Sequence, residues 1–224
     1  MRIFEDIYII PGFVNSYLVE REHDCVLIDT GMSKKANNTI RAIKSYCSDK
    51  PLKAIIITHS HLDHIGGLET LGNLFGAEVV SHKEESPFIM KTKKLPSKQG
   101  FFGKLTRSFS NISFGSGHKI NQMVTNGEIV YGLKVFHLPG HTPGSIALED
   151  TETSALFCGD IINTNKKGDT ILPPKKSFAS NYEQALESSI KMFKLSKPKV
   201  ILPGHGKPII DPENAIKIYI EKYS

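Results

Sequence analysis

The stretch ITHSHLDHIGG, residues 57–67, constrains this chain more than any other part of its sequence. It overlaps the end of the apolar run 54–57, AIII. Within six residues it contains three of the nine histidines and an aspartate: His59, His61, Asp63 and His64. A continuous apolar run predicts a buried strand, and catalytic side chains commonly lie on loops at the end of such a strand. The stretch therefore predicts a functional site that a rigid strand presents.

The spacing of these side chains predicts two metal positions. His59 and His61 are two residues apart, so in an extended or looped backbone they point to the same side and converge on one point. Asp63 and His64 are adjacent, and in a turn or a first helical turn they diverge from the first pair toward a second point.

Two metal ions need more donors than this stretch supplies. Each ion takes about four nitrogen or oxygen ligands, and a catalytic ion keeps one position for water. Three other places offer donors at the end of an apolar run or in a Gly/Pro-bounded turn: His141 in LPGHTPGS, Asp160 in LFCGD and His205 in ILPGHG. We expect these three side chains to complete the metal site.

The order of predicted elements repeats once along the chain. In the first half, strands at residues 7–10, 16–20 and 25–28 are followed by a helix after Gly31 and by a buried strand at 53–58. In the second half, ALFCGD precedes a helix and then PKVILPGHG. That helix has a capping-box signature, Ser180-x-x-Glu183, and a last helix is expected after Asp211. One β-α-β plan thus occurs twice.

Composition favours a compact protein without a membrane span. With 224 residues, the sequence predicts a single domain over 1–224. Neither a secretion signal nor an apolar run of about 18 residues is present, so a cytoplasmic location is expected. The three cysteines, Cys25, Cys47 and Cys158, are an odd number without C-x-x-C spacing, which favours reduced core thiols. The sequence does not predict an oligomeric state.

The basic character is concentrated in one segment. Residues 83–125 contain eight Lys or Arg and two Glu, a net +6 in a chain of net +5, and they include five phenylalanines. We expect an insertion here, because a loop of this length is uncommon in a compact domain unless it is a lid, a binding loop or a disordered segment. A solvated loop, a lid over the metal edge that attracts anions, and a nucleic-acid or membrane contact all stay open.

Five sequence blocks in this order resemble the metallo-β-lactamase superfamily of metal-dependent hydrolases: LIDTG, the histidine-rich stretch at 57–67, and the turns that carry His141, Asp160 and His205. The motif pattern is most similar to glyoxalase II-like and lactonase-like members. The resemblance covers residues 7 to about 208. It implies an α/β fold, a four-layer αβ/βα sandwich of two similar halves, with two metal ions at one edge between them.

The resemblance also implies a role for each donor. His59, His61 and His141 would hold the first ion, Asp63, His64 and His205 the second, and Asp160 would bridge both. Asp29 in LIDTG resembles the aspartate that braces the metal loop. His137 is expected to pack or to support a ligand, and His23, His82 and His118 are expected on the surface.

The predicted function is a binuclear metal-dependent hydrolase that uses a metal-bridging hydroxide. The cofactors would be two divalent ions, zinc first, with iron or manganese as alternatives, and Asp63 and Asp160 are the candidates for proton transfer. The expected partner is a small-molecule substrate, a (thio)ester, lactone or phosphoester that can be anionic. No membrane span and no nucleic-acid partner are expected, although the basic segment keeps nucleic acid open.

Two other activities stay open within the resemblance. A mononuclear iron persulfide dioxygenase would need only His59, His141 and Asp160 as a facial site. A nucleic-acid-processing phosphodiesterase would use the basic segment, but many such relatives have a long extra domain. Glyoxalase II enzymes add a C-terminal helical domain to bind glutathione, and because only 19 residues follow His205, that substrate is not favoured.

Overall fold

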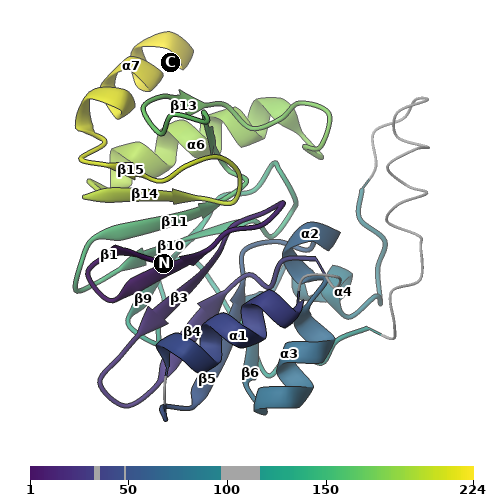
Figure 1. The fold of residues 1–224 in the computed structure, drawn as a ribbon. Coiled ribbons are helices and arrows are strands. Elements are labelled where there is room, and N and C mark those ends of the chain that lie inside the picture. Colours follow the sequence, from purple (N-terminus) through teal and green to yellow (C-terminus); the bar gives the residue numbers. More distant parts are fainter. Residues whose placement is uncertain (33–35, 48, 97–116) are drawn as a thin grey trace. The chain divides into compact units, whose positions relative to one another are not determined.

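Figure 1 shows the fold of the protein in a computed structural model, which describes residues 1–32, 36–47, 49–96 and 117–224. The packing of the chain defines two compact units, Met1–Met123 and Val124–Ser224, which we call unit 1 and unit 2. Each is described by itself below. The expectation of a single domain over residues 1–224 stays a prediction.

Unit 1 is built on a seven-stranded sheet whose strands follow one another in chain order. Strands β1 to β4 are antiparallel neighbours, whereas β4, β5 and β6 run parallel. The strands are β1 (Arg2–Phe4), β2 (Ile7–Ile10), β3 (Ser16–Glu20), β4 (Cys25–Ile28), β5 (Leu52–Ile57), β6 (Glu78–His82) and β7 (Gln122–Val124). The carboxyl ends of β4, β5 and β6 therefore meet at one edge of the sheet.

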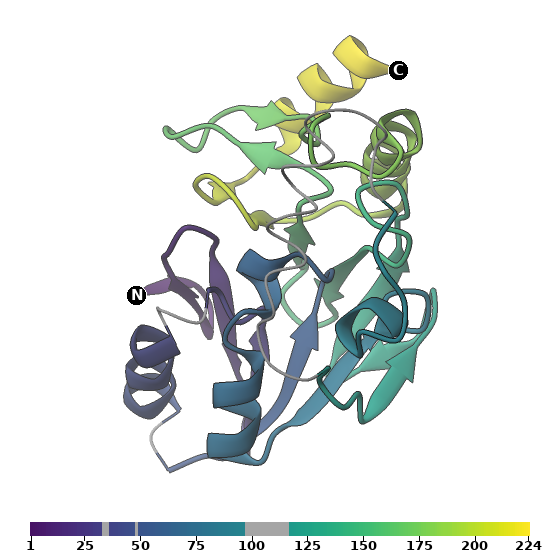
Figure 2. The same ribbon diagram turned by 90° about the vertical axis from the view of Figure 1, so that its right-hand side faces the viewer.

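Two helices of unit 1 cover one face of this sheet. Helices α1 (Ala36–Tyr46) and α3 (Leu68–Phe75) contact each other, and Figures 1 and 2 show them side by side. Ile43 of α1 and Leu71 of α3 are buried in one core with residues of β3, β4 and β5. Two single-turn helices, α2 (Leu62–Ile65) and α4 (Ser86–Ile89), follow β5 and β6 along the chain.

Unit 2 is built on a six-stranded sheet in the order β15-β14-β11-β10-β9-β8. Its strands are β8 (Ile129–Val130), β9 (Leu133–His137), β10 (Ile146–Asp150), β11 (Ala155–Gly159), β14 (Val200–Pro203) and β15 (Ile209–Ile210). A short hairpin, β12 (Asn163–Thr164) with β13 (Ile171–Leu172), lies outside this sheet. Within this sheet, whose residues are all described, β11 and β14 form the only parallel pair.

Helices α6 (Tyr182–Leu195) and α7 (Glu213–Tyr223) pack with one face of the unit 2 strands. Met192 of α6 and Tyr219 of α7 are buried in a core with residues of β9, β10, β11 and β14. The Tyr219 hydroxyl bonds the Ser189 hydroxyl at 2.7 Å, so its buried polar atom is satisfied.

The predicted β-α-β plan is present in both units. In unit 1, the parallel strands β4 and β5 are connected through α1. In unit 2, the parallel strands β11 and β14 are connected through the hairpin and α6. The prediction of an α/β fold with two similar halves is confirmed.

The predicted insertion at 83–125 is only partly described. Its beginning forms α4, where Ile89 is fully buried, and its end contains β7 of the unit 1 sheet, so neither end is a free loop. Lys91, Lys93 and Lys94 are exposed. Lys98, Lys104, Arg107 and four of the five phenylalanines, Phe101, Phe102, Phe109 and Phe114, lie outside the described residues.

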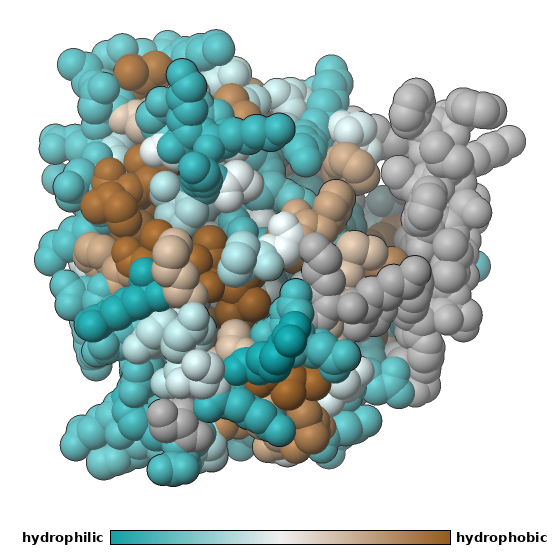
Figure 3. Space-filling model, in the orientation of Figure 1, coloured by the Kyte–Doolittle hydropathy of each residue, from teal (hydrophilic) through white to brown (hydrophobic). Residues whose placement is uncertain are grey.

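The surface carries both hydrophilic and hydrophobic residues, as the face in Figure 3 shows. The exposed large apolar side chains are spread along the chain and include Phe13, Met123, Phe178 and Ile218. Within the described ranges, no helix combines the length and the apolar character that crossing a bilayer requires.

The start of α6 differs by one residue from its predicted cap. Asn181, not Ser180, is the N-cap, and its side-chain oxygen accepts a hydrogen bond from the Gln184 amide at 3.1 Å. Ser180 instead donates its amide to the His141 carbonyl at 2.9 Å. This hydrogen bond joins residues that are far apart in the chain, so the sequence around Ser180 could not predict it.

The prediction of three reduced core thiols is wrong for two of them. All three cysteines are buried, but Cys25 and Cys47 form a disulfide. Cys25 begins β4 and Cys47 follows α1, and the packing of α1 on the sheet brings their Cα atoms to 6.2 Å. Sequence spacing could not show this proximity, which depends on tertiary packing.

Replacing the α6 cap should destabilise the protein. Asn181→Ala leaves the Gln184 amide without its acceptor, so we expect the free energy of unfolding to fall by about 1 kcal/mol. Urea unfolding measures the change, and Asn181→Asp, which keeps an acceptor, should stay within a few tenths of a kcal/mol of the parent, a range typical of exchanges among good caps. Equal stability of the Ala variant and the parent would contradict this role.

The cysteines can be counted by thiol titration. We expect no reactive thiol in the native protein, one per chain after unfolding without reductant, and three after unfolding with reductant. Three thiols in the protein unfolded without reductant would show that Cys25 and Cys47 are not paired. The count also bears on the expected cytoplasmic location, because stable disulfides are rare in that compartment.

Candidate metal centre

The first four donors lie at and just beyond the carboxyl end of β5. His59 follows the strand, His61 occupies the N-cap position of α2 in an extended conformation, and Asp63 and His64 lie within α2. His59 and His64 are buried, whereas His61 and Asp63 are partly exposed. The backbone changes from extended to helical at His61. The ring of His59 nevertheless lies nearer to that of His64, at 3.9 Å between centroids, than to that of His61, at 4.7 Å. That the two pairs of side chains serve different ions stays a prediction.

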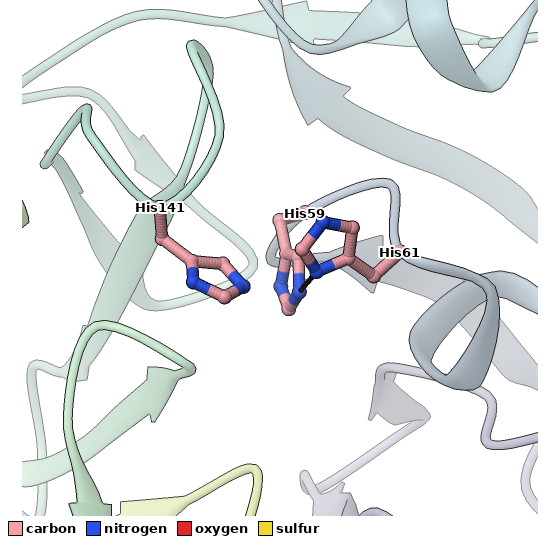
Figure 4. A group of neighbouring side chains, drawn as sticks. All are labelled: His59, His61 and His141. Atoms are coloured by element: carbon pink, nitrogen blue, oxygen red, sulfur yellow. Dashed lines mark hydrogen bonds between the residues drawn. The ribbon is translucent and has the colours of Figure 1, made fainter. Parts of the chain in front are cut away.

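His59 and His61 bring two ring nitrogens together. His59 Nε2 lies 3.1 Å from His61 Nδ1, and Figure 4 shows the two rings turned toward each other. Two imidazole nitrogens that share a tetrahedral zinc ion with bonds of about 2.0–2.1 Å are separated by about 3.3 Å. The two nitrogens would therefore need to move apart only slightly to bind the same metal ion.

His64 is oriented by Asp29. Its Nδ1 lies 2.7 Å from Asp29 Oδ2, and both side chains are buried. A proton on Nδ1 donates to this carboxylate and leaves Nε2 deprotonated, the form that binds a metal. The expectation that Asp29 braces the loop thus has a physical basis in this contact.

Asp29 holds the loop at two further points. Its Oδ1 accepts from the Thr58 amide at 2.9 Å, and its Oδ2 accepts from the Thr58 hydroxyl at 2.7 Å. Its own backbone has a φ of 55°, a left-handed conformation that aspartate tolerates better than most residues. Next to it, the amide and the hydroxyl of Thr30 both donate to the His64 carbonyl at 2.8 Å.

In unit 2, His141 lies on the loop between β9 and β10, from which Figure 4 shows its ring extending. This loop is tied to α6: the Asn181 amide donates to the Gly140 carbonyl at 2.8 Å, and the Ser188 hydroxyl donates to the Pro139 carbonyl at 2.7 Å. A side chain at Gly140 would meet the Ala185 amide nitrogen at 2.2 Å. Glycine at this position therefore allows the close approach that fixes His141.

Asp160 and His205 follow the two parallel strands of unit 2, β11 and β14. Asp160 Oδ2 lies 3.7 Å from His141 Nε2 and 3.5 Å from His205 Nε2. Both distances exceed the usual hydrogen-bond limit of about 3.2 Å, but they suit donors that share a metal ion. One carboxylate oxygen thus lies within 4 Å of a ring nitrogen of each of two histidines.

All seven predicted ligands are thus placed with other donors of their own unit. Each of them also belongs to a group of His and Asp side chains that could hold a metal ion. His137 belongs to no such group among the described residues, and its Nε2 bonds the Pro143 carbonyl at 2.9 Å, which steadies the loop of His141. The assignment of each ligand to a particular ion stays a prediction.

Three further titratable side chains are buried: Cys158, His82 and Glu85. Cys158 is buried in the unit 2 core, where burial raises the pKa of its thiol, and among the described residues it belongs to no candidate metal group. His82 was expected on the surface, but it is buried at the end of β6. Glu85, which the sequence did not single out, is a fully buried carboxylate that bonds the loop of His59.

Removing the Asp29 carboxylate should weaken metal binding. We expect Asp29→Ala to reduce metal affinity by about 10- to 100-fold, because His64 loses the partner that orients its ring. Metal titration of the stripped protein measures the effect, and Asp49→Ala, at an exposed aspartate, is the matched control. Unchanged affinity in Asp29→Ala would contradict the bracing role.

Comparison with known proteins identifies the family. The model of the metallo-beta-lactamase superfamily matches residues 9–205. GloC of Haemophilus influenzae, named a hydroxyacylglutathione hydrolase, is 31% identical over 85% of this chain and 84% of its own length. YflN of Bacillus subtilis, named a probable metallo-hydrolase, is 30% identical over 87% of this chain and 81% of its own.

The fold also matches solved structures. TTHA1623, whose crystal structure is in a di-iron-bound form, superposes with a TM-score of 0.67 at 24% identity, over 90% of this chain and 92% of that chain. This likeness confirms the predicted fold class and nothing finer. Because the family model spans most of the sequence and includes all seven donors, the chain belongs to the metallo-β-lactamase superfamily of metal-dependent hydrolases.

Proposed function

We propose that this protein is a binuclear metal-dependent hydrolase and that its seven His and Asp donors hold two divalent ions. His59, His61 and His141 would hold one ion, and Asp63, His64 and His205 the other. Asp160 would contact both. The observation that carries the proposal is the position of the Asp160 Oδ2 atom between His141 and His205, together with the converging nitrogens of His59 and His61.

Zinc suits this donor set best. Four or more imidazole nitrogens with carboxylate oxygens, and no thiolate, are typical of zinc and of other borderline divalent metals. Iron stays an alternative, since the related fold of TTHA1623 was solved with two iron ions. Metal analysis of the purified protein decides between them.

When bound, a pair of such ions would lower the pKa of water toward about 7 and would polarise the carbonyl or phosphoryl oxygen of a substrate. The chain itself then has two tasks. Asp63 and Asp160 would accept the proton from the water, and Asp29 holds the loop that carries His59, His61 and His64 in place. No serine or cysteine nucleophile is required, and the buried Cys158 takes no part.

We propose a small thioester as the first substrate to test, with lactones and phosphoesters next. The support is the relative GloC, whose name gives it a glutathione thioester as substrate, and which this chain matches over most of its length. A glutathione thioester belongs in the panel for that reason.

The test combines metal removal with one ligand variant. We expect a chelator to abolish turnover and added zinc to restore it. His59→Ala should lose turnover by about 10³-fold or more, because Lewis-acid stabilisation supplies several kcal/mol. His23→Ala, at an exposed histidine, should match the parent.

Three results would contradict the proposal. Full activity in metal-stripped protein would exclude the mechanism, and unchanged turnover in His59→Ala would exclude that ligand. Oxygen consumption with one bound iron per chain, and no hydrolysis of any substrate in the panel, would support the persulfide dioxygenase alternative instead.

A further inference from the structure

Glu85 is a buried carboxylate outside the seven candidate ligands. It lies at the N-terminal side of α4, three residues beyond the end of β6, and its side chain is 0% exposed. Burying a carboxylate is unfavourable unless it is well hydrogen-bonded or paired. Its burial therefore calls for a structural or functional reason.

The carboxylate reaches the centre of the metal loop. Glu85 Oε1 accepts a hydrogen bond from the Ser60 amide at 2.7 Å. Ser60 is the residue between His59 and His61 and is itself buried. The distance lies at the short end of the range for charge-assisted hydrogen bonds.

The backbone that carries Glu85 is firmly held. Its amide donates to the His82 carbonyl at 2.9 Å, and its carbonyl accepts from the Phe88 amide at 3.0 Å. The next residue, Ser86, bonds the Ser81 hydroxyl at 2.7 Å and is fully buried. The carboxylate thus extends from a packed turn and not from a loose loop.

Strand order explains how Glu85 and Asp29 reach the same loop. β5 lies between β4 and β6 in the sheet, and all three run parallel. Asp29 follows β4 and accepts from the Thr58 amide, whereas Glu85 follows β6 and accepts from the Ser60 amide. Two carboxylates from the neighbouring strands on either side therefore bind alternate amides of the loop after β5.

We infer that Glu85 is a positioning residue for His59 and His61. Its Oε1 atom accepts the hydrogen bond from the Ser60 amide. This bond holds the backbone between the two histidines in the conformation that brings their ring nitrogens together. A loop that is ordered before metal binds does not spend binding energy on ordering. The part of this inference that concerns metal affinity rests on the proposed function.

The experiment compares three variants with the parent. Glu85→Ala removes the acceptor, Glu85→Gln keeps a carbonyl oxygen at the same place, and Glu84→Ala removes the adjacent exposed carboxylate as a control. Cobalt(II) binding to the metal-stripped proteins is followed by absorption. Hydrogen exchange of the Ser60 amide is measured in the same proteins without metal.

We expect Glu85→Ala to bind cobalt about 10- to 100-fold more weakly than the parent, as is typical when a residue that supports a ligand is lost. Its Ser60 amide should exchange faster, while the Thr58 amide, which Asp29 holds, should change little. Glu85→Gln and Glu84→Ala should resemble the parent in both measurements.

The inference would be overturned if Glu85→Ala matched the parent in both cobalt affinity and hydrogen exchange of the Ser60 amide. It would also be overturned if Glu85→Gln were as impaired in these measurements as Glu85→Ala. The exchange measurement needs no metal. If the parent bound no cobalt, the proposed metal centre would fail, while faster Ser60 exchange confined to Glu85→Ala would still support Glu85 as the residue that positions this loop.

Discussion

Asp29 accepts hydrogen bonds from the Thr58 amide, the Thr58 hydroxyl and the His64 ring, and the geometry of the metal loop depends on these contacts. The parallel pairing of β4 with β5, in register at Ile28 and Ile56, brings the aspartate level with the end of β5. A buried carboxylate with this many donors is satisfied, and it sets the orientation of the ring that faces it. The four donors after β5 are thus positioned by the neighbouring strand as well as by their own.

In unit 2, the packing of buried strands positions the candidate ligands Asp160 and His205. β11 and β14 are buried along their whole lengths; Asp160 is the first residue after β11 and His205 the second after β14. Gly206 has a φ of 99°, and a side chain there would meet the Thr164 carbonyl at 2.2 Å, so His205 is followed by a turn that favours glycine. Sites supported by rigid elements and close packing hold catalytic groups more accurately than free loops do.

Much of this organisation could be read from the sequence, because the features concerned are local. The apolar run before Thr58, the spacing of His59, His61, Asp63 and His64, and the repeated β-α-β order each follow from residues that are near in the chain. The superfamily and its fold class are implied by the resemblance of these sequence blocks to a known family, and the comparisons confirm both.

The features that the sequence did not reveal depend on contacts between distant residues. Cys25 meets Cys47 only because α1 folds back on the sheet. His82 at the end of β6 and Glu85 just after it are buried by the tertiary packing of unit 1. The α6 cap lies at Asn181, while Ser180 bonds the His141 loop. A carboxylate shortly after each of the two strands that flank β5 is a pattern that could have indicated Glu85, once the strand order was known.

Anomalous X-ray diffraction from crystals of the purified protein, recorded at the absorption edge of its metal, tests the central claim most directly. The account predicts two peaks per chain, about 3.5–4 Å apart, as in other two-metal hydrolytic sites. One peak should be surrounded by His59, His61 and His141, the other by Asp63, His64 and His205, and Asp160 should contact both. A single peak, or two peaks of which only one contacts Asp160, would contradict the binuclear site proposed for this protein.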